Sequence, residues 1–194
     1  MIIYAFDERF EPEVRRASSR ETVSDIKIVT ILESDSLNVA IDKIRVKART
    51  EGNIWLLRII AHAYPGRVLL GSGFVEAGHA RAFSVLAPYF TPGCPGIEFH
   101  SCNLASSTPE TIAQIDVTGA TRTHSYGTPG RGSNDGIGPA FLLAIAQATG
   151  VNVTAGYDTQ FVDRGFRWEG RGTTTVEPSG TTETRVGPDA APIG

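Results

Sequence analysis

The chain has little cysteine. Cys94 and Cys102 are the only two cysteines among its 194 residues. A turn-forming run, Pro-Gly-Cys-Pro-Gly over 92–96, leads into an apolar stretch that ends at Cys102. An extended segment between the two cysteines holds their sulfur atoms too far apart for a disulfide bond. We therefore expect both thiols to be reduced, which suits a cytosolic protein.

The chain also lacks a long apolar run and a strong excess of either charge. No stretch approaches the roughly twenty apolar residues that a transmembrane helix needs. The apolar start, 1–6, is too short for a signal peptide, has no basic leader and meets Asp7 and Glu8 at once. A net charge of −3 gives no electrostatic reason to expect a nucleic-acid or membrane partner. We expect a cytoplasmic protein whose first residues form a strand.

What is present is an alternation of strand-like and helix-like segments. β-branched and apolar runs over 1–6, 26–32, 54–61, 96–101 and 151–155 predict strands. Helical spacing of apolar residues up to Gly52, over 80–90, and from Pro139 to Gly150 predicts helices between them. Repeated strand–helix–strand units favour a parallel sheet. We predict a single α/β domain over 1–178, a three-layer α-β-α sandwich with a mostly parallel sheet and a C-terminal hairpin or edge strand.

Two segments predict irregular structure. The stretch 106–136 is rich in Thr, Ser, Gly and Arg and is interpreted as a long loop, where substrate contacts or regulation would lie. Flexible Gly-Arg-Gly segments are easily cut, so self-cleavage at Arg122 or Arg131 is one hypothesis, with a plain solvated loop as the other. The stretch 179–194 is interpreted as a disordered tail.

Two of the expected strands end in chemically capable residues, His62 and Cys102. Open α/β sheets bind and react just outside the carboxyl ends of their strands. A cysteine and a histidine at neighbouring strand ends can serve as a nucleophile and its proton shuttle. Either residue alone is more often a packed structural residue. The coincidence of position predicts a cysteine hydrolase.

This layout resembles the caspase-like cysteine peptidases, the group of caspases, metacaspases, gingipains, clostripain and separase. A closer resemblance is to an uncharacterised caspase-like domain of large bacterial surface proteins. The chain departs from that pattern at Ala63, where the domain has Gly, and at Ser101, where it has Gly or Ala. The Gln-Ala-Cys-Arg-Gly signature of true caspases is absent, so Asp-directed cleavage is not implied. The matching segments are His62-Ala63, Leu70-Gly71, Ser101-Cys102-Asn103-Leu104-Ala105 and the run from Phe141 to Val153.

The resemblance implies a peptidase acting on a peptide or protein substrate without a cofactor. Cys102 would attack the carbonyl carbon as a thiolate, and His62 would transfer the protons. The backbone N–H groups of Ala63 and Cys102 would face the developing oxyanion. Asp135 and Asp158 are candidates for an acidic substrate pocket that selects Arg or Lys, although both also fit turn or helix-cap positions. The oligomeric state stays open.

Other interpretations remain. His62, His100, Cys94 and Cys102 are residue types that bind zinc, but no compact pair of ligands is present, so no metal is expected. His100 is either a packed strand residue or an alternative partner for the thiol. The chain could also be a noncatalytic caspase-like binding module, because a fold can persist after its catalytic activity is lost. An acyl-transfer or deamidation enzyme using the same cysteine and histidine is a third possibility.

Overall fold

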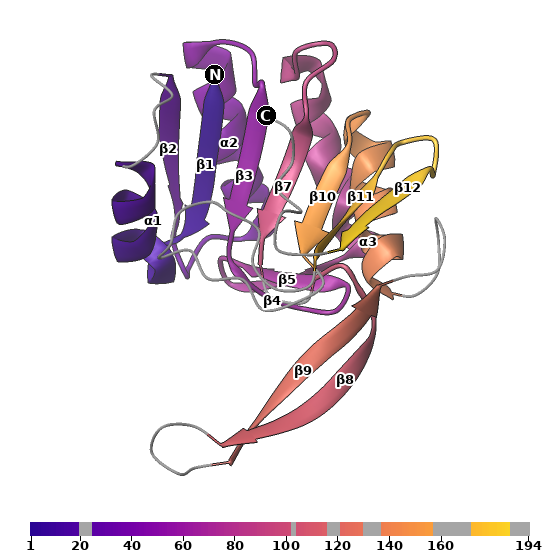
Figure 1. The fold of residues 1–194 in the computed structure, drawn as a ribbon. Helices are drawn as coiled ribbons and strands as arrows, with labels where there is room; N and C mark the ends of the chain where they lie inside the picture. The colour runs from indigo at the N-terminus through magenta and orange to yellow at the C-terminus, as the bar shows by residue number, and fades with distance from the viewer. Residues whose placement is uncertain (20–24, 102–103, 116–120, 130–136, 157–171, 187–194) are drawn as a thin grey trace.

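The computed structural model describes residues 1–19, 25–101, 104–115, 121–129, 137–156 and 172–186, and its centre is a mixed seven-stranded sheet. The strand order is β12-β11-β10-β7-β3-β1-β2 (Figure 1). The five strands from β2 to β10 are parallel, and β11 and β12 are antiparallel. The predictions of an α/β class, a mostly parallel sheet and antiparallel C-terminal strands are confirmed. The strands are β1 (Ile2–Asp7), β2 (Ile26–Ile31), β3 (Leu56–Ile60), β7 (Gly96–His100), β10 (Val153–Gly156), β11 (Gly172–Val176) and β12 (Thr182–Val186).

The main hydrophobic core lies on one face of this sheet. Alternate residues of each central strand point to that face, among them Ile59 of β3 and Phe99 of β7, both fully buried. Helices α2 (Leu37–Glu51), η2 (Ala77–Tyr89) and α3 (Ile137–Thr149) cover it, behind the sheet in Figure 1. On the opposite face, η1 (Glu8–Phe10) and α1 (Glu11–Ser18) contribute Phe10 and Val14 to a second, smaller apolar cluster. The fully buried members of that cluster on the sheet are Tyr4, Phe6 and Ile60.

The predicted helix up to Gly52 is confirmed as α2, and its ends follow from local chemistry. The Ser36 hydroxyl accepts a hydrogen bond from the Val39 N–H group, which satisfies one of the free donors of the first turn. Gly52 ends the helix at φ +118°, a backbone conformation that L side chains rarely adopt. The helix therefore starts after a short loop that follows β2, and it returns the chain to the edge at which β3 begins.

The segment 77–89 is a 3₁₀ helix, which corrects the expectation of an α-helical face over 80–90. The residues that it buries are Ala80, Phe83 and Leu86. They recur every three residues, which is the repeat of a 3₁₀ helix and aligns their side chains along one edge.

A three-stranded antiparallel sheet follows β3 directly. Its strands are β4 (His62–Tyr64), β5 (Arg67–Leu70) and β6 (Gly73–Glu76). Figure 1 shows it at the edge of the main sheet where the parallel strands end. Its inner side chains, Ala63, Val68 and Val75, are buried in the main core. The main core therefore holds the small sheet at the carboxyl edge of the main sheet.

The interpretation of 106–136 as a long loop is wrong for most of that segment. β8 (Ser106–Ile115) and β9 (Thr121–Pro129) pair antiparallel and project from the carboxyl edge of the sheet (Figure 1). Ser, Thr and Gly suggested a loop, but threonine is β-branched and favours strands when a partner is present. Arg122 lies in β9 opposite Gln114, so cleavage there would require the pair to open. Arg131 lies outside the described residues.

The interpretation of 179–194 as a disordered tail is also wrong in part. β12 pairs antiparallel with β11, with Val176 opposite Thr182. The segment has too few apolar residues to form a core, but β11 supplies partners for its backbone N–H and C=O groups. Residues 187–194 lie outside the described part of the chain.

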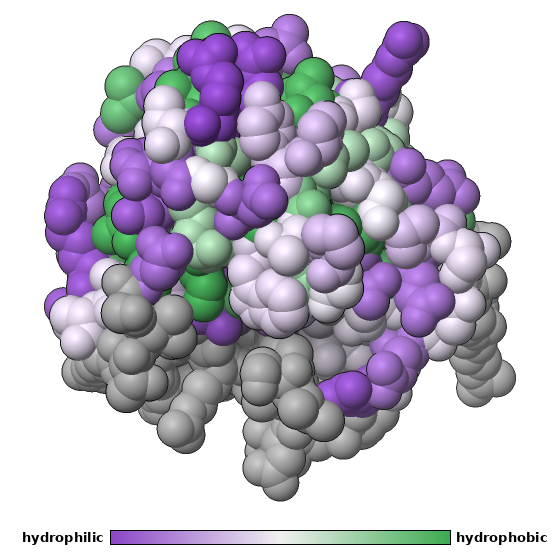
Figure 2. All heavy atoms as spheres, turned by 90° about the horizontal axis from the view of Figure 1, so that it is seen from above, coloured by the Kyte–Doolittle hydropathy of each residue, from purple (hydrophilic) through white to green (hydrophobic). Residues whose placement is uncertain are grey.

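The surface of the molecule mixes polar and apolar side chains. Figure 2 looks onto the edge at which the parallel strands begin and shows hydrophilic residues interspersed with hydrophobic ones. Within the ranges that the structure describes, no helix is both long enough and apolar enough to cross a lipid bilayer.

The turn between β5 and β6 depends on Gly71, which generates a test. Gly71 has φ +65°, and a Cβ atom there would lie 2.2 Å from the backbone oxygen of Asp35. We expect Gly71→Ala to lower the free energy of unfolding by about 3 kcal/mol, because backbone strain and a clash with main-chain atoms add. Urea denaturation measures the change.

Gly93→Ala is the matched control. Gly93 has φ +72°, but nothing lies within 4 Å of the added carbon. The Gly93→Ala variant should lose only about 1 kcal/mol of the free energy of unfolding, the cost of the backbone conformation alone. Equal losses in the two variants would show that the contact with the loop after β2 does not hold the small sheet.

Candidate functional site

The ends of β3 and β7 define the candidate site. These two strands are parallel neighbours, and Ile60 of β3 is aligned with His100 of β7. His62 follows Ile60 by two residues, and Cys102 follows His100 by two residues. Cys102 itself lies outside the described residues. The structure therefore confirms that the two strands leading to the predicted pair are adjacent and end in register at one edge of the sheet.

His62 is the first residue of β4 and is exposed to solvent. Its imidazole packs against the Phe10 ring, with ring centroids 4.6 Å apart and planes tilted by 54°. Phe10 in turn packs against the smaller apolar cluster on the face of the sheet away from the helices. His62 is thus supported on one side of its ring and is also open to solvent.

The chain on both sides of Cys102 is held by neighbouring elements. Ser101 is buried, and its hydroxyl has no hydrogen-bond partner among the described residues. The Leu104 carbonyl accepts a hydrogen bond from the Gly66 N–H group at 3.1 Å, and the Ala105 N–H group donates to Gly156 at 3.1 Å. Gly66 belongs to the turn between β4 and β5. The strand that begins at His62 is therefore linked to the segment that follows Cys102.

Ala63 is the other predicted site residue that the structure describes. It is buried in the middle of β4 and pairs with Val68 of β5. The two-residue turn that joins these strands makes Tyr64 and Arg67 the closing pair. Antiparallel pairs alternate between hydrogen-bonded and non-hydrogen-bonded, and the closing pair of such a hairpin is hydrogen-bonded. The Ala63 N–H group therefore points away from β5.

A buried polar cluster crosses the middle of the sheet, before the strands reach their carboxyl ends. Tyr4, Arg58 and Glu98 are aligned on β1, β3 and β7. Arg58 donates to the Tyr4 hydroxyl through Nη1 and to Glu98 Oε2 through Nε, both at 2.8 Å. The guanidinium also lies 5.4 Å from the centroid of the Tyr4 ring. This cluster joins the two strands that lead to His62 and Cys102.

His100 belongs to the same cluster. It is buried, and its Nε2 atom lies 3.1 Å from Glu98 Oε2. Burial alone raises the pKa of Glu98, but the hydrogen bond with His100 and the charge of Arg58 outweigh it and hold the pKa below its usual value. Of the two interpretations of His100, the one as a packed strand residue fits its burial.

Of the remaining predicted residues, Cys94 is described by the structure and lies far from His62. Cys94 lies in the turn before β7, and His62 lies beyond the end of the neighbouring β3, so the length of the sheet separates them. Its thiol is partly buried, and burial raises its pKa. Asp135 and Asp158 lie outside the described residues. Among the residues that are described, no three His, Cys, Asp or Glu side chains come together as metal ligands would.

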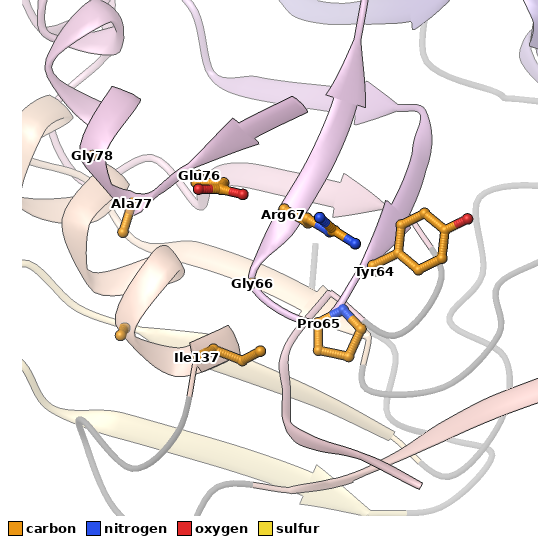
Figure 3. A pocket seen from close by; sticks show the side chains of 9 residues that line it. Tyr64, Pro65, Gly66, Arg67, Glu76, Ala77, Gly78 and Ile137 are labelled. Atoms are coloured by element: carbon orange, nitrogen blue, oxygen red, sulfur yellow. The ribbon is translucent and has the colours of Figure 1, made fainter. Parts of the chain in front are cut away.

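A groove of about 540 Å³ lies beside the small sheet (Figure 3). Its lining includes Tyr64 and Arg67 from the β4–β5 hairpin, Glu76 from the end of β6 and Ile137 from the start of α3. The turn approaches α3 so closely that a Cβ atom at Gly66 would lie 2.7 Å from the Ile137 carbonyl oxygen. The groove therefore opens next to the strand that His62 begins.

Two features of this edge were missed by the sequence analysis. Arg58 and Glu98 each interrupt an otherwise apolar strand, and opposite charges in two buried strands are a usable indication of pairing. Arg67, Tyr64 and Phe74 come together only through the register of the small sheet. No spacing in the chain indicates that second grouping.

Comparison of the chain with protein-family models, with curated protein sequences and with solved structures finds no match in any of the three.

The buried Glu98 carboxylate generates a pH-dependent prediction. Its pKa is lowered in the folded state, so its contribution to stability is complete above the unfolded value of about 4.3 and is lost as the pH falls through the folded value. We expect Glu98→Gln to lower the free energy of unfolding by about 3 kcal/mol at pH 7, because Arg58 and His100 stay buried without the charge. The deficit should shrink below pH 4.

Urea denaturation of both proteins between pH 7 and pH 3 measures this difference. Glu183→Gln is the control, since Glu183 pairs with Arg185 at an exposed position of β12. It should change stability by less than about 0.5 kcal/mol at any pH. A Glu98→Gln deficit that stays constant down to pH 3 would contradict the assignment.

Proposed function

We propose that the chain is a cysteine peptidase with a caspase-like, three-layer fold, in which Cys102 is the nucleophile and His62 is the general acid and base. The observation that carries the proposal is the parallel pairing of β3 with β7, with Ile60 aligned with His100. Each strand is followed two residues later by one of the two reactive side chains. Neighbouring parallel strands deliver such residues to one edge, where α/β proteins form their sites.

The hydrogen bond between Gly66 and Leu104 supports the same arrangement. It joins the hairpin that starts at His62 to a residue only two positions after Cys102. Chain connectivity limits how far apart the two segments can be, since consecutive Cα atoms are about 3.8 Å apart. The strands that precede His62 and Cys102 are therefore aligned in register, and the segments that follow these two residues are joined by a hydrogen bond.

The reaction would proceed through a covalent acyl-enzyme. The Cys102 sulfur, as thiolate, attacks the peptide carbonyl carbon, and the C–N bond breaks as His62 gives a proton to the leaving amine. Water then attacks the thioester, His62 accepts its proton, and the thiolate leaves. An exposed histidine suits this role because its two ring nitrogens can both accept and donate protons.

The Ala63 N–H group is the proposed oxyanion donor, together with that of Cys102. Its orientation away from β5 directs it toward the side of β4 on which no strand pairs within the described ranges. A donor in that position is typically worth about 3 kcal/mol in the transition state. Alanine supplies this N–H group as well as glycine would, so the departure from the family pattern at this position does not remove it.

The first test of the proposal is selective alkylation of the two thiols. At pH 7, iodoacetamide should label Cys102 at least tenfold faster than Cys94, whose pKa burial raises. His62→Gln should remove most of the difference, because the imidazole no longer stabilises the thiolate. Peptide mass spectrometry after timed quenching measures both rates in the same molecule.

His79→Gln is the matched control, because His79 is an exposed histidine on η2. Its Nδ1 atom accepts a hydrogen bond from the Glu76 N–H group. The variant should leave the labelling ratio unchanged. A mixed peptide library should be cleaved by the parent protein and not by Cys102→Ala. Equal slow labelling of both thiols together with an uncut library would contradict the peptidase proposal and favour a noncatalytic binding module.

A further inference from the structure

The outer face of the small sheet carries His62 in a defined pattern. Residues opposite one another on adjacent strands share a face, so the register gives two rows across β4, β5 and β6. One row is His62, Leu69 and Phe74, and the other is Tyr64, Arg67 and Glu76. The inner face is occupied by Ala63 and its buried neighbours. A ligand that reaches His62 therefore meets the second row next.

Arg67 is held in this second row by two aromatic rings. Its guanidinium carbon lies 5.1 Å from the centroid of the Tyr64 ring and 4.7 Å from that of Phe74. The two rings contact each other edge to face at 5.8 Å. Cation–π contacts of this kind fix the side chain without neutralising its charge. Arg67 is thus ordered in advance for a ligand, which reduces the entropy that binding costs.

Arg67 forms no ion pair with any carboxylate in the described part of the chain, and it is exposed to solvent. Glu76 is aligned with it across β5 and β6. Figure 3, however, shows the Arg67 side chain extending toward Tyr64 and away from Glu76. Glu76 also immediately precedes η2, where the partial positive charge of a helix start offsets a carboxylate. The cation is therefore open to an external anion.

The spacing between the two rows sets where that anion would be on a substrate. His62 and Tyr64 are two residues apart on β4, about 7 Å along a strand. An extended peptide advances about 3.3 Å per residue. A side chain that reaches Arg67 therefore belongs to a residue two or three positions from the bond that lies beside His62. The groove of about 540 Å³ lies between Arg67 and Ile137 and offers room for that part of a chain.

We propose that Arg67, clamped by Tyr64 and Phe74, is a specificity residue that binds an acidic side chain two or three residues from the cleaved bond of a peptide substrate. This inference rests on the proposed peptidase function. A guanidinium matches a carboxylate with two parallel hydrogen bonds, a geometry that a lysine or an amide cannot provide. The exposed faces of the Tyr64 and Phe74 rings would contact the aliphatic part of the same side chain.

A binding experiment that requires no turnover tests the inference. Cys102→Ala protein is titrated with fluorescein-labelled heptapeptide pools in which one position at a time is Asp, Asn or Lys. Fluorescence anisotropy should show about tenfold tighter binding of the Asp pool than the isosteric Asn pool at one position. Arg67→Glu should abolish this preference and favour the Lys pool there.

Arg49→Glu is the matched control, since Arg49 is an exposed arginine near the end of α2, at the opposite edge of the sheet. It changes the net charge equally and should keep the preference for Asp. Equal binding of the Asp and Asn pools at every position would overturn the role of Arg67. An Arg67-dependent preference for Asp, in a chain whose parent form leaves every pool uncut, would overturn the peptidase function alone and support Arg67 as an anion site.

Discussion

The ion pair between Arg58 and Glu98 is the constraint on which the rest of the structure depends. It joins β3 to β7 in the middle of the sheet, and both side chains are largely buried. A buried charge without a partner costs far more than a matched pair gains, so such a pair selects a register more than it adds stability. A shift of one residue between β3 and β7 would place Arg58 and Glu98 on opposite faces of the sheet and break the pair. The alignment of Ile60 with His100, and with it the geometry of the strand ends, follows from this pairing.

The small sheet completes the candidate site at these strand ends. A strand that simply ended at Ile60 would leave His62 on an unsupported loop. Instead the chain reverses through β4 and β5, and the apolar inner face of this hairpin packs into the main core. Two glycines with positive φ, Gly66 and Gly71, let its turns approach α3 and the loop after β2. The hairpin is thereby fixed at both ends while its outer face stays open.

The division between the two faces of that hairpin has a chemical consequence. The inner face contributes to stability, and the outer face places an imidazole, two aromatic rings and a guanidinium within one exposed surface. Because β4 carries both His62 and Tyr64, any movement of this strand would move the proposed proton shuttle together with one of the two rings that hold Arg67. Reactivity and substrate choice are then coupled through a single short strand.

The sequence alone determined the α/β class, the parallel strands up to β10 and the positions of α2 and α3, because apolar periodicity and helix ends are local properties of the chain. It also indicated that His62 and Cys102 each follow an apolar strand. It misassigned β8, β9 and β12, whose polar residues become strands only when another strand supplies hydrogen-bond partners. Only the tertiary structure decided that β3 and β7 are neighbours, that Arg58 meets Glu98 and that Arg67 lies between Tyr64 and Phe74. Those contacts join residues on separate strands, and they depend on register, which no spacing along a single chain encodes.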